Sequence, residues 1–253
     1  FDRATTYFYT VSVHDALPIS RLANSLQTDG AISLHTSEPE VDLPVDVGKV
    51  HYRGMALLGS VDGRVADSYR ANNREALVAG GRAWFVGGAG PMGQMHVIKA
   101  MMDEHGPTDI LVTDLSDERL ASLKHLLSLL GRKKQRKVTL TFENPKDLPA
   151  DELQTFLTTK YPGGFDDVVV LVPVQAIITQ ASHYLAPAGV LNIFAGVKLG
   201  TITDLPFSPI VKDRVRIIGS SGSPLAAMRD TLALTESGCM STSYSLAAVG
   251  DMG

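Results

Sequence analysis

The sequence predicts an α/β protein built on a doubly wound parallel sheet of the Rossmann type, preceded by a partial second Rossmann-like unit. Short runs that are apolar at nearly every position alternate with segments of helical period. Such runs are typical of parallel strands that are covered by helices on both faces. One of these runs leads directly into a glycine cluster that opens a helix. The chain of 253 residues is 44% hydrophobic and 20% charged, so it also has ample apolar material for a buried core.

Strands and helices are expected to alternate along the chain. Glycines mark several ends, as at Gly59 and Gly80, while Pro91 and Asp117 suit the first turns of their helices. Strands are expected at residues 31–35, 55–58, 82–86, 109–113, 138–142, 167–172, 190–194 and 215–218. Helices are expected at residues 21–27, 62–77, 91–104, 117–130, 150–160, 174–185 and 224–236.

Composition and charge exclude several classes of function. The net charge of −4 makes general nucleic-acid binding a poor hypothesis, and the basic run at 132–137 is interpreted as a solvated helix end. The single cysteine, Cys239, excludes an internal disulfide and any zinc site built on several thiolates of this chain. The longest unbroken apolar stretch, 168–174, is far shorter than the roughly 18 residues of a membrane helix. We expect a cytoplasmic protein with neither a nucleic-acid nor a membrane partner.

Both ends of the chain are expected to be cuts. Residues 1–20 lack the features of a secretory signal, and the run 14–19 resembles a translated sequencing adapter. We interpret 1–20 as an artefact or a disordered segment, with a natural strand and turn as the alternative. The expected division is then 21–60 as the tail of an upstream Rossmann-like module, 61–238 as the cofactor domain and 239–253 as the start of a return to a catalytic domain.

A weak internal repeat supports the partial second unit. Gly30 and Gly59 lie 29 positions apart, and Gly189 and Gly219 lie 30 apart. Both copies are expected to run helix, strand, loop, strand, helix, although chance similarity between two α/β segments is the alternative. Leu26, Gly30, Asp42-Leu43-Pro44, Gly59-Ser60 and Arg70 match Leu185, Gly189, Asp204-Leu205-Pro206, Gly219-Ser220 and Arg229.

The strongest chemical signal is the glycine loop after residues 82–86. Gly88, Gly90 and Gly93 have the G-x-G-x-x-G spacing between an apolar strand and a helix. Gly88 would allow the tight turn, Gly90 the close approach of a pyrophosphate, and Gly93 the packing of helix against strand. Pro91 and Met92 would begin a helix whose free N–H groups face the phosphates. A glycine-rich turn without a ligand is the alternative.

An acidic residue follows where a dinucleotide fold needs one. Asp114 ends the next strand, 26 positions after Gly88. A carboxylate there accepts hydrogen bonds from the adenine ribose and repels a 2′-phosphate, so NAD is favoured and NADP is less favoured. Arg119 could weaken this preference by offering a positive charge to a phosphate.

These residues together resemble the cofactor domain of the medium-chain zinc-type alcohol dehydrogenase superfamily. Later segments are similar to its sorbose-1-phosphate reductase and sorbitol dehydrogenase-like branch, and the resemblance covers roughly residues 62–250. The segments are Gly164-Phe165-Asp166-Asp167-Val168, Pro173-Val174, Gly189-Val190-Leu191-Asn192-Ile193-Phe194-Ala195-Gly196 and Ile218-Gly219-Ser220-Ser221-Gly222-Ser223.

The resemblance implies further contacts with the cofactor. Pro173 and Val174 would face the adenine or the ribose. The loop with Ala195 and Gly196 would approach the nicotinamide, as would Gly219 and Ser220. Ordinary turns at strand ends are the alternative for all six residues.

The resemblance also implies a reaction, but it assigns no catalytic residue and no metal ligand in this chain. The intact protein would be an NAD(P)-dependent oxidoreductase that transfers hydride between NAD and a secondary alcohol of a polyol or sugar phosphate. No catalytic residue or metal ligand is assigned, because His35, His51 and His96 lack ligand spacing. Zinc would belong to a domain missing from this chain, so the fragment would be inactive alone. A non-catalytic NAD-sensing or structural Rossmann module is the alternative, and homo-oligomerisation is left open.

Overall fold

The chain forms a nine-stranded sheet whose larger part has the Rossmann strand order. The computed structural model describes residues 10–12, 28–35, 42–61, 64, 66–68, 74, 76–131, 136–223 and 225–238. Six strands run in the order β7-β6-β5-β8-β9-β11, and all their pairings are parallel. Counted along the chain, this is the 3-2-1-4-5-6 order of dinucleotide-binding folds, which confirms the predicted fold class. The strands are β5 (Arg82–Val86), β6 (Asp109–Thr113), β7 (Thr139–Glu143), β8 (Phe165–Val170), β9 (Leu185–Ile193) and β11 (Arg216–Gly219).

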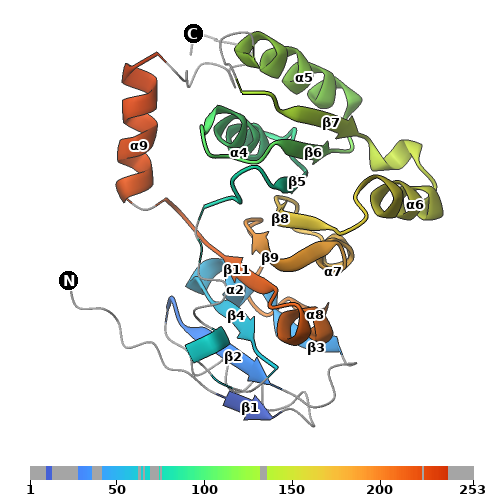
Figure 1. The fold of residues 1–253 in the computed structure, drawn as a ribbon, viewed down its shortest axis with the longest axis vertical. Coiled ribbons are helices and arrows are strands. Elements are labelled where there is room, and N and C mark those ends of the chain that lie inside the picture. Colours follow the sequence, from blue (N-terminus) through green and yellow to red (C-terminus); the bar gives the residue numbers. More distant parts are fainter. Residues whose placement is uncertain are drawn as a thin grey trace, which may run out of the picture.

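Helices cover both faces of this sheet (Figure 1). Successive residues of β5 show why its sequence is apolar throughout: Ala83 and Phe85 pack in one buried cluster, Trp84 and Val86 in the other. The first cluster includes residues of α4 (Pro91–Met102) and α5 (Asp117–Gly131), the second those of α6 (Ala150–Lys160) and α7 (Gln175–Ser182). A 3₁₀ turn, η1, spans Pro145–Asp147.

A second, smaller group of strands continues the sheet beyond β11. The order there is β11-β4-β2-β1, with β4 (Ala56–Gly59), β2 (Ala31–His35) and β1 (Thr10–Ser12). The three strands are parallel to one another, but β4 lies antiparallel to β11. The partial unit predicted before the main one is therefore a real group of strands, shown in blue in Figure 1.

The expected loop inside each repeat is wrong, because each contains a strand and a helix. β3 (Asp42–Asp46) pairs antiparallel with β10 (Ile202–Pro206), and α2 (Val47–Arg53) and α8 (Phe207–Lys212) follow them. Asp46 caps α2 by accepting a hydrogen bond from the Lys49 N–H, and Gly54 ends it at φ +60°. These capping residues were a sequence signal for α2 that the apolar period missed.

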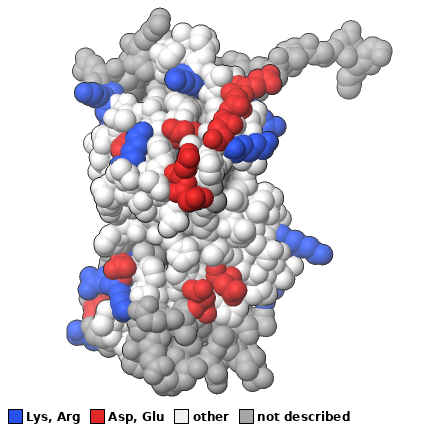
Figure 2. All heavy atoms as spheres, turned by 90° about the vertical axis from the view of Figure 1, so that its right-hand side faces the viewer, with Lys and Arg blue, Asp and Glu red and all other residues white. Residues whose placement is uncertain are grey.

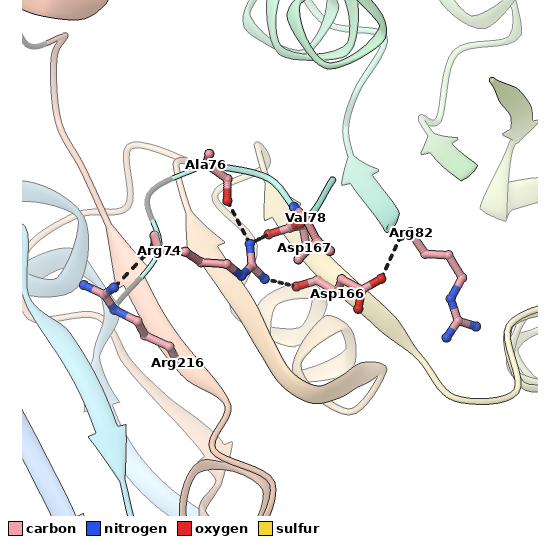
Figure 3. A network of polar contacts seen from close by, with 7 residues as sticks. All are labelled: Arg74, Ala76, Val78, Arg82, Asp166, Asp167 and Arg216. Carbon is pink, nitrogen blue, oxygen red and sulfur yellow. Dashed lines mark hydrogen bonds and ion pairs between the residues drawn. The ribbon is translucent and has the colours of Figure 1, made fainter. Parts of the chain in front are cut away.

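The expected helix over 62–77 is also wrong at its C-terminal end, where the structure describes residues 74, 76 and 77. Residues 66–68 are helical, whereas 76–78 are not. Arg74 and residues 76–82 lie instead beside the start of β8, where the carboxylates of Asp166 and Asp167 accept hydrogen bonds from Arg74 and from the backbone N–H groups of Val78 and Arg82 (Figure 3). These contacts replace the hydrogen bonds that a helix would make.

Several expectations fall on residues outside the described part of the chain. They concern the helix at 21–27, the repeat positions Leu26 and Arg70, and most of the basic run at 132–137. Cys239 and the return segment at 239–253 fall there as well. Of the terminal segment 1–20, the structure describes residues 10–12 as β1, which pairs with β2, so the alternative of a natural strand has support there. The proposed domain division stays a prediction.

Asp166 and Asp167 join Arg74, Val78 and Arg82 to the main sheet. The Arg74 guanidinium donates to an Asp167 carboxylate oxygen and to the backbone carbonyls of Asp166 and Ala76. The other carboxylate oxygen of Asp167 accepts from the Val78 N–H at 2.8 Å. Burial raises the pKa of Asp167, and the Val78 N–H and Arg74 oppose that rise. The Asp-Asp pair of the family-like segment thus has a clear structural role.

Arg74→Met should destabilise the fold by about 3 kcal/mol at neutral pH, because it leaves a buried carboxylate without its ion-pair partner. The folded pKa of Asp167 would then rise further above its ordinary value, so the native state would take up a proton earlier on acidification. The loss should therefore shrink as the pH falls through the raised pKa. Urea unfolding at neutral and acidic pH measures both effects.

Arg64→Met is the matched control, since Arg64 pairs with Asp67 at an exposed site. Arg64→Met should lower the free energy of unfolding by less than about 1 kcal/mol. If both variants lost the same free energy of unfolding, or if the loss in Arg74→Met did not change with pH, the role given to Arg74 would be contradicted.

Candidate functional site

The glycine loop between β5 and α4 is fixed by the neighbouring strand. The N–H groups of Gly87 and Gly88 both donate to the Thr113 carbonyl at the end of β6, at 2.8 and 3.1 Å. Gly87 has φ +76°, a conformation that side-chain-bearing residues rarely adopt. The Gln94 side chain donates to the Ala89 carbonyl at 2.9 Å. The loop is thus held by bonds from both sides before any ligand binds.

The three spaced glycines meet different surroundings. A Cβ on Gly88 would lie 2.8 Å from the Val112 side chain, and one on Gly93 would lie 2.5 Å from the backbone of Gly88. A Cβ on Gly90 would meet only the Gly87 carbonyl oxygen, at 3.6 Å. Gly88 and Gly93 are therefore required by packing, whereas the space at Gly90 is open.

The first turn of α4 offers donors that no side chain satisfies. Gly90 is the N-cap residue, Pro91 follows it, and no side chain of the described residues caps this end. Unsatisfied N–H groups and the helix dipole together favour an anion at such a terminus. The residues present therefore fit a phosphate group.

Asp114 lies beside this terminus, just beyond the end of β6. One of its carboxylate oxygens accepts from the Ala89 N–H at 3.2 Å, and the other accepts from the Ser116 N–H at 3.2 Å. The bonds hold the carboxylate at the carboxyl edge of the sheet, where doubly wound proteins bind ligands.

A cavity of about 520 Å³ opens between the glycine loop, the end of β6 and the start of α7. Its volume is within the range usual for small-molecule sites, and most of its lining is apolar. The structure brings seven of the predicted site residues into this lining: Gly90, Pro91, Met92, Gly93, Asp114, Arg119 and Val174.

The other six predicted residues lie outside the lining. Gly88 is buried within the glycine loop, while Pro173 and Ser220 are exposed. Ala195 is buried and Gly196 exposed just beyond the end of β9. Gly219 faces the backbone of α2, where a Cβ would lie 2.8 Å from the Val50 carbonyl oxygen.

Sequence reasoning missed the apolar wall of the cavity. Leu115 is 57% exposed directly after Asp114, and Trp84 donates to the Thr113 hydroxyl at 3.0 Å. The place of Leu115 after a strand end was an available signal, but Trp84 is the middle residue of β5, and both residue types suggest core packing. The missed lining residues are Trp84, Val86, Gly87, Thr113, Leu115, Pro145, Leu153, Leu171, Val172, Ile177 and Gln180.

Two histidines flank Phe194 just beyond the end of β9. His96 of α4 lies 4.4 Å from the Phe194 ring centroid and His51 of α2 lies 6.3 Å from it, both edge to face. Burial lowers the pKa of His96, and its Nδ1 donates to the Met92 carbonyl at 2.8 Å. The His51 Nδ1 bonds to the Ile193 carbonyl at 3.2 Å. Both rings therefore serve to hold this loop in place.

Other parts of the described chain give weaker candidates for a functional site. A hollow of about 990 Å³ lies between α6 and α7, but the first turn of α6 that lines it carries Asp151, whose negative charge would repel a phosphate. No three His, Cys, Asp or Glu side chains gather as a metal site among the described residues. No described helix is long and apolar enough to span a bilayer. On the face shown in Figure 2, basic side chains are scattered among acidic ones.

Curated relatives share about two thirds of this chain. An uncharacterised Escherichia coli protein, YggP, is 28% identical over 186 residues, covering 73% of the chain and 43% of YggP. Mannitol-1-phosphate 5-dehydrogenase of Aliivibrio fischeri is 28% identical, over 68% of the chain and 41% of the relative. L-sorbose 1-phosphate reductase of Klebsiella pneumoniae is 29% identical, over 62% and 36%. The chain thus spans about two fifths of their length, and no family model matches it.

Solved structures agree in fold. The 2R,3R-butanediol dehydrogenase of Bacillus subtilis is 24% identical with a TM-score of 0.52, over 66% of this chain and 43% of that one. An E. coli alcohol dehydrogenase in complex with NADH is 14% identical with a TM-score of 0.52, over 71% and 46%. With its Rossmann strand order, its glycine loop and these sequence relatives, the chain resembles the medium-chain zinc alcohol dehydrogenase superfamily.

Proposed function

We propose that this chain binds NAD in the 520 Å³ cavity, as the cofactor-binding part of a dehydrogenase that acts on a polyol or sugar phosphate. The observation that carries the proposal is the uncapped N-terminus of α4, which opens on the cavity next to Asp114. The N–H groups of Met92 and Gly93 are donors suited to a pyrophosphate, and the Asp114 carboxylate is an acceptor suited to the hydroxyls of a ribose. They lie in the order along the chain that dinucleotide-binding folds show.

Each part of the cavity has a task in this proposal. The N–H groups of Met92 and Gly93 would hold the pyrophosphate, and Asp114 would accept from the ribose hydroxyls. Leu115 and Val174 would cover apolar ring surface. The loop after β9, braced by His51 and His96, would lie on the nicotinamide side. Bound NAD supplies the acceptor or donor of hydride, and the protein supplies its orientation.

The substrate class rests on the relatives. Two of them are named for mannitol 1-phosphate and L-sorbose 1-phosphate, which are both phosphorylated six-carbon compounds with secondary oxygen functions. A hydride exchange between the nicotinamide and such a carbon is the reaction class that we propose for the whole protein. The solved relative in complex with NADH supports the choice of a nicotinamide cofactor.

Gly90→Val should abolish NAD binding without loss of stability, because its side chain would project into open space where the pyrophosphate is proposed to lie. Gly93→Ala should instead destabilise the fold by about 1–3 kcal/mol, since its Cβ would meet the Gly88 backbone. Isothermal titration with NAD, together with thermal unfolding, separates the two effects.

Gly163→Val controls for the added volume, because a Cβ there would meet only the Arg82 guanidinium, at 3.2 Å or more. It should leave NAD binding unchanged. Wild-type protein that binds neither NAD nor NADP would refute the proposal, and so would a Gly90→Val variant that binds NAD like the wild type.

Asp114→Asn should lower the affinity for NAD roughly tenfold, the cost of weakening a charged hydrogen bond, and should raise the affinity for NADP relative to NAD. Arg119, which also lines the cavity, would then offer its positive charge to a 2′-phosphate without an opposing carboxylate at position 114. Titrations with both dinucleotides measure the ratio. Glu118→Gln removes an equal charge from the exposed first turn of α5 and should leave the ratio unchanged. An unaltered ratio in Asp114→Asn would exclude the ribose role.

A further inference from the structure

The Rossmann strand order also indicates where the second half of a bound dinucleotide would lie. The order reverses between β5 and β8, and dinucleotides cross the carboxyl edge of the sheet at such a point. In the proposed function the adenine ribose lies beside Asp114, at the end of β6, and the pyrophosphate lies at the N-terminus of α4. The nicotinamide half would therefore extend over the ends of β8, β9 and β11, on the other side of β5.

The helix α2 lies against two of these strand ends (Figure 1). A Cβ on Gly219, the last residue of β11, would lie 2.8 Å from the Val50 carbonyl oxygen of α2. The His51 Nδ1 bonds to the carbonyl of Ile193, the last residue of β9, at 3.2 Å. A helix from the N-terminal part of the chain thus forms part of the surface over which the nicotinamide half would lie.

The loop after β9, residues 194–201, is also held by α2 and its capping residue. The Asp46 carboxylate, which caps α2, accepts a hydrogen bond from the Gly200 N–H at 3.1 Å. Gly48 lies so close to the loop that a Cβ there would overlap the Lys198 carbonyl oxygen. The position of this loop at the carboxyl edge therefore depends on α2.

One turn further along α2, the Tyr52 side chain reaches the same loop. Its hydroxyl lies 3.4 Å from the place that a Cβ on Gly196 would take. Apart from the chain neighbours of Gly196, no other described residue comes within 4 Å of that place. Tyr52 and Gly48 are four positions apart, so they share one side of the helix. The hydroxyl thus stands beside open space at an exposed glycine.

The neighbouring polar side chains of this part of α2 already have tasks in the fold. The His51 ring is buried, and its Nδ1 is bonded to the Ile193 carbonyl. The Asp46 carboxylate holds both its own helix and Gly200. Tyr52 differs from both, because it is 48% exposed and its hydroxyl bonds to no other described residue. It is therefore well placed to bond to a ligand.

We propose that α2 completes the nicotinamide end of the site, and that the Tyr52 hydroxyl donates a hydrogen bond to the carboxamide oxygen of bound NAD. This inference rests on the proposed function, since it needs NAD to lie across the carboxyl edge of the sheet. A tyrosine hydroxyl is a donor and a carboxamide oxygen is an acceptor. Gly196, which has no side chain, leaves room for the carboxamide beside the hydroxyl.

The test compares NAD with ADP-ribose, which has every group of NAD except the nicotinamide ring. Tyr52→Phe removes only the hydroxyl and should weaken the binding of NAD about fivefold, the effect of one lost hydrogen bond. The binding of ADP-ribose should stay unchanged, whereas a hydroxyl that only supported the fold would affect both ligands. Isothermal titration of the full chain with each ligand measures the two affinities, and circular dichroism checks that the variant is folded.

Two further variants locate the effect. Tyr184→Phe removes the same hydroxyl group in the hollow between α6 and α7, and it should change neither affinity. Gly196→Val fills the space beside the Tyr52 hydroxyl, so it should weaken the binding of NAD and leave that of ADP-ribose unchanged.

The possible results separate this inference from the proposed function. If Tyr52→Phe weakened NAD and ADP-ribose equally, or left NAD binding unchanged, the inference would be overturned. The proposed function would stand in both cases, because the wild-type chain would still bind NAD. A wild-type chain that bound neither NAD nor ADP-ribose would refute the proposed function, and this inference with it.

Discussion

The candidate site depends on one close approach, the contact of the first turn of α4 with the turn that ends β5. Gly93 brings the helix so near to Gly88 that no side chain could stand between them. The free N–H groups of α4 therefore open at the carboxyl edge of the sheet. The Thr113 carbonyl holds the same turn from the neighbouring strand, which in turn places Asp114 beside the helix end. Loop, helix dipole and carboxylate thus share a single backbone framework.

The fold could be predicted wherever local sequence determines structure. Residues 109–113 and 150–160 were placed at the observed bounds because both elements bury one regular apolar pattern. β3 and β10 were missed because each is stabilised by a partner about 160 positions away, and neither has a strong strand pattern of its own. The helix expected at 62–77 does not include residues 74, 76 and 77, because the hydrogen bonds of Arg74 and Asp167 there outweigh the local helix propensity.

The residues of the site also divide into those that the sequence predicts and those that only the fold shows. Gly90, Gly93 and Asp114 were predictable because a phosphate loop needs particular residue types at fixed spacing. Trp84 and Leu115 carry no such signal, since only the folded strand ends show which apolar side chains line a cavity and which fill the core. Gly219 has a sequence signal but a different environment, because the helix that covers it comes from the other copy of the repeat.

Because β4 pairs antiparallel with β11, the strands of the first group run in the opposite direction to those of the main group. The strands β2 and β4 end at His35 and Gly59, on the edge opposite to the one where β9 and β11 end. The His35 Nδ1 already bonds to the Ser60 carbonyl at 3.0 Å there. A ligand bound at the carboxyl ends of β2 and β4 would therefore lie at the opposite edge of the sheet from the cavity beside α4, and could not reach that cavity.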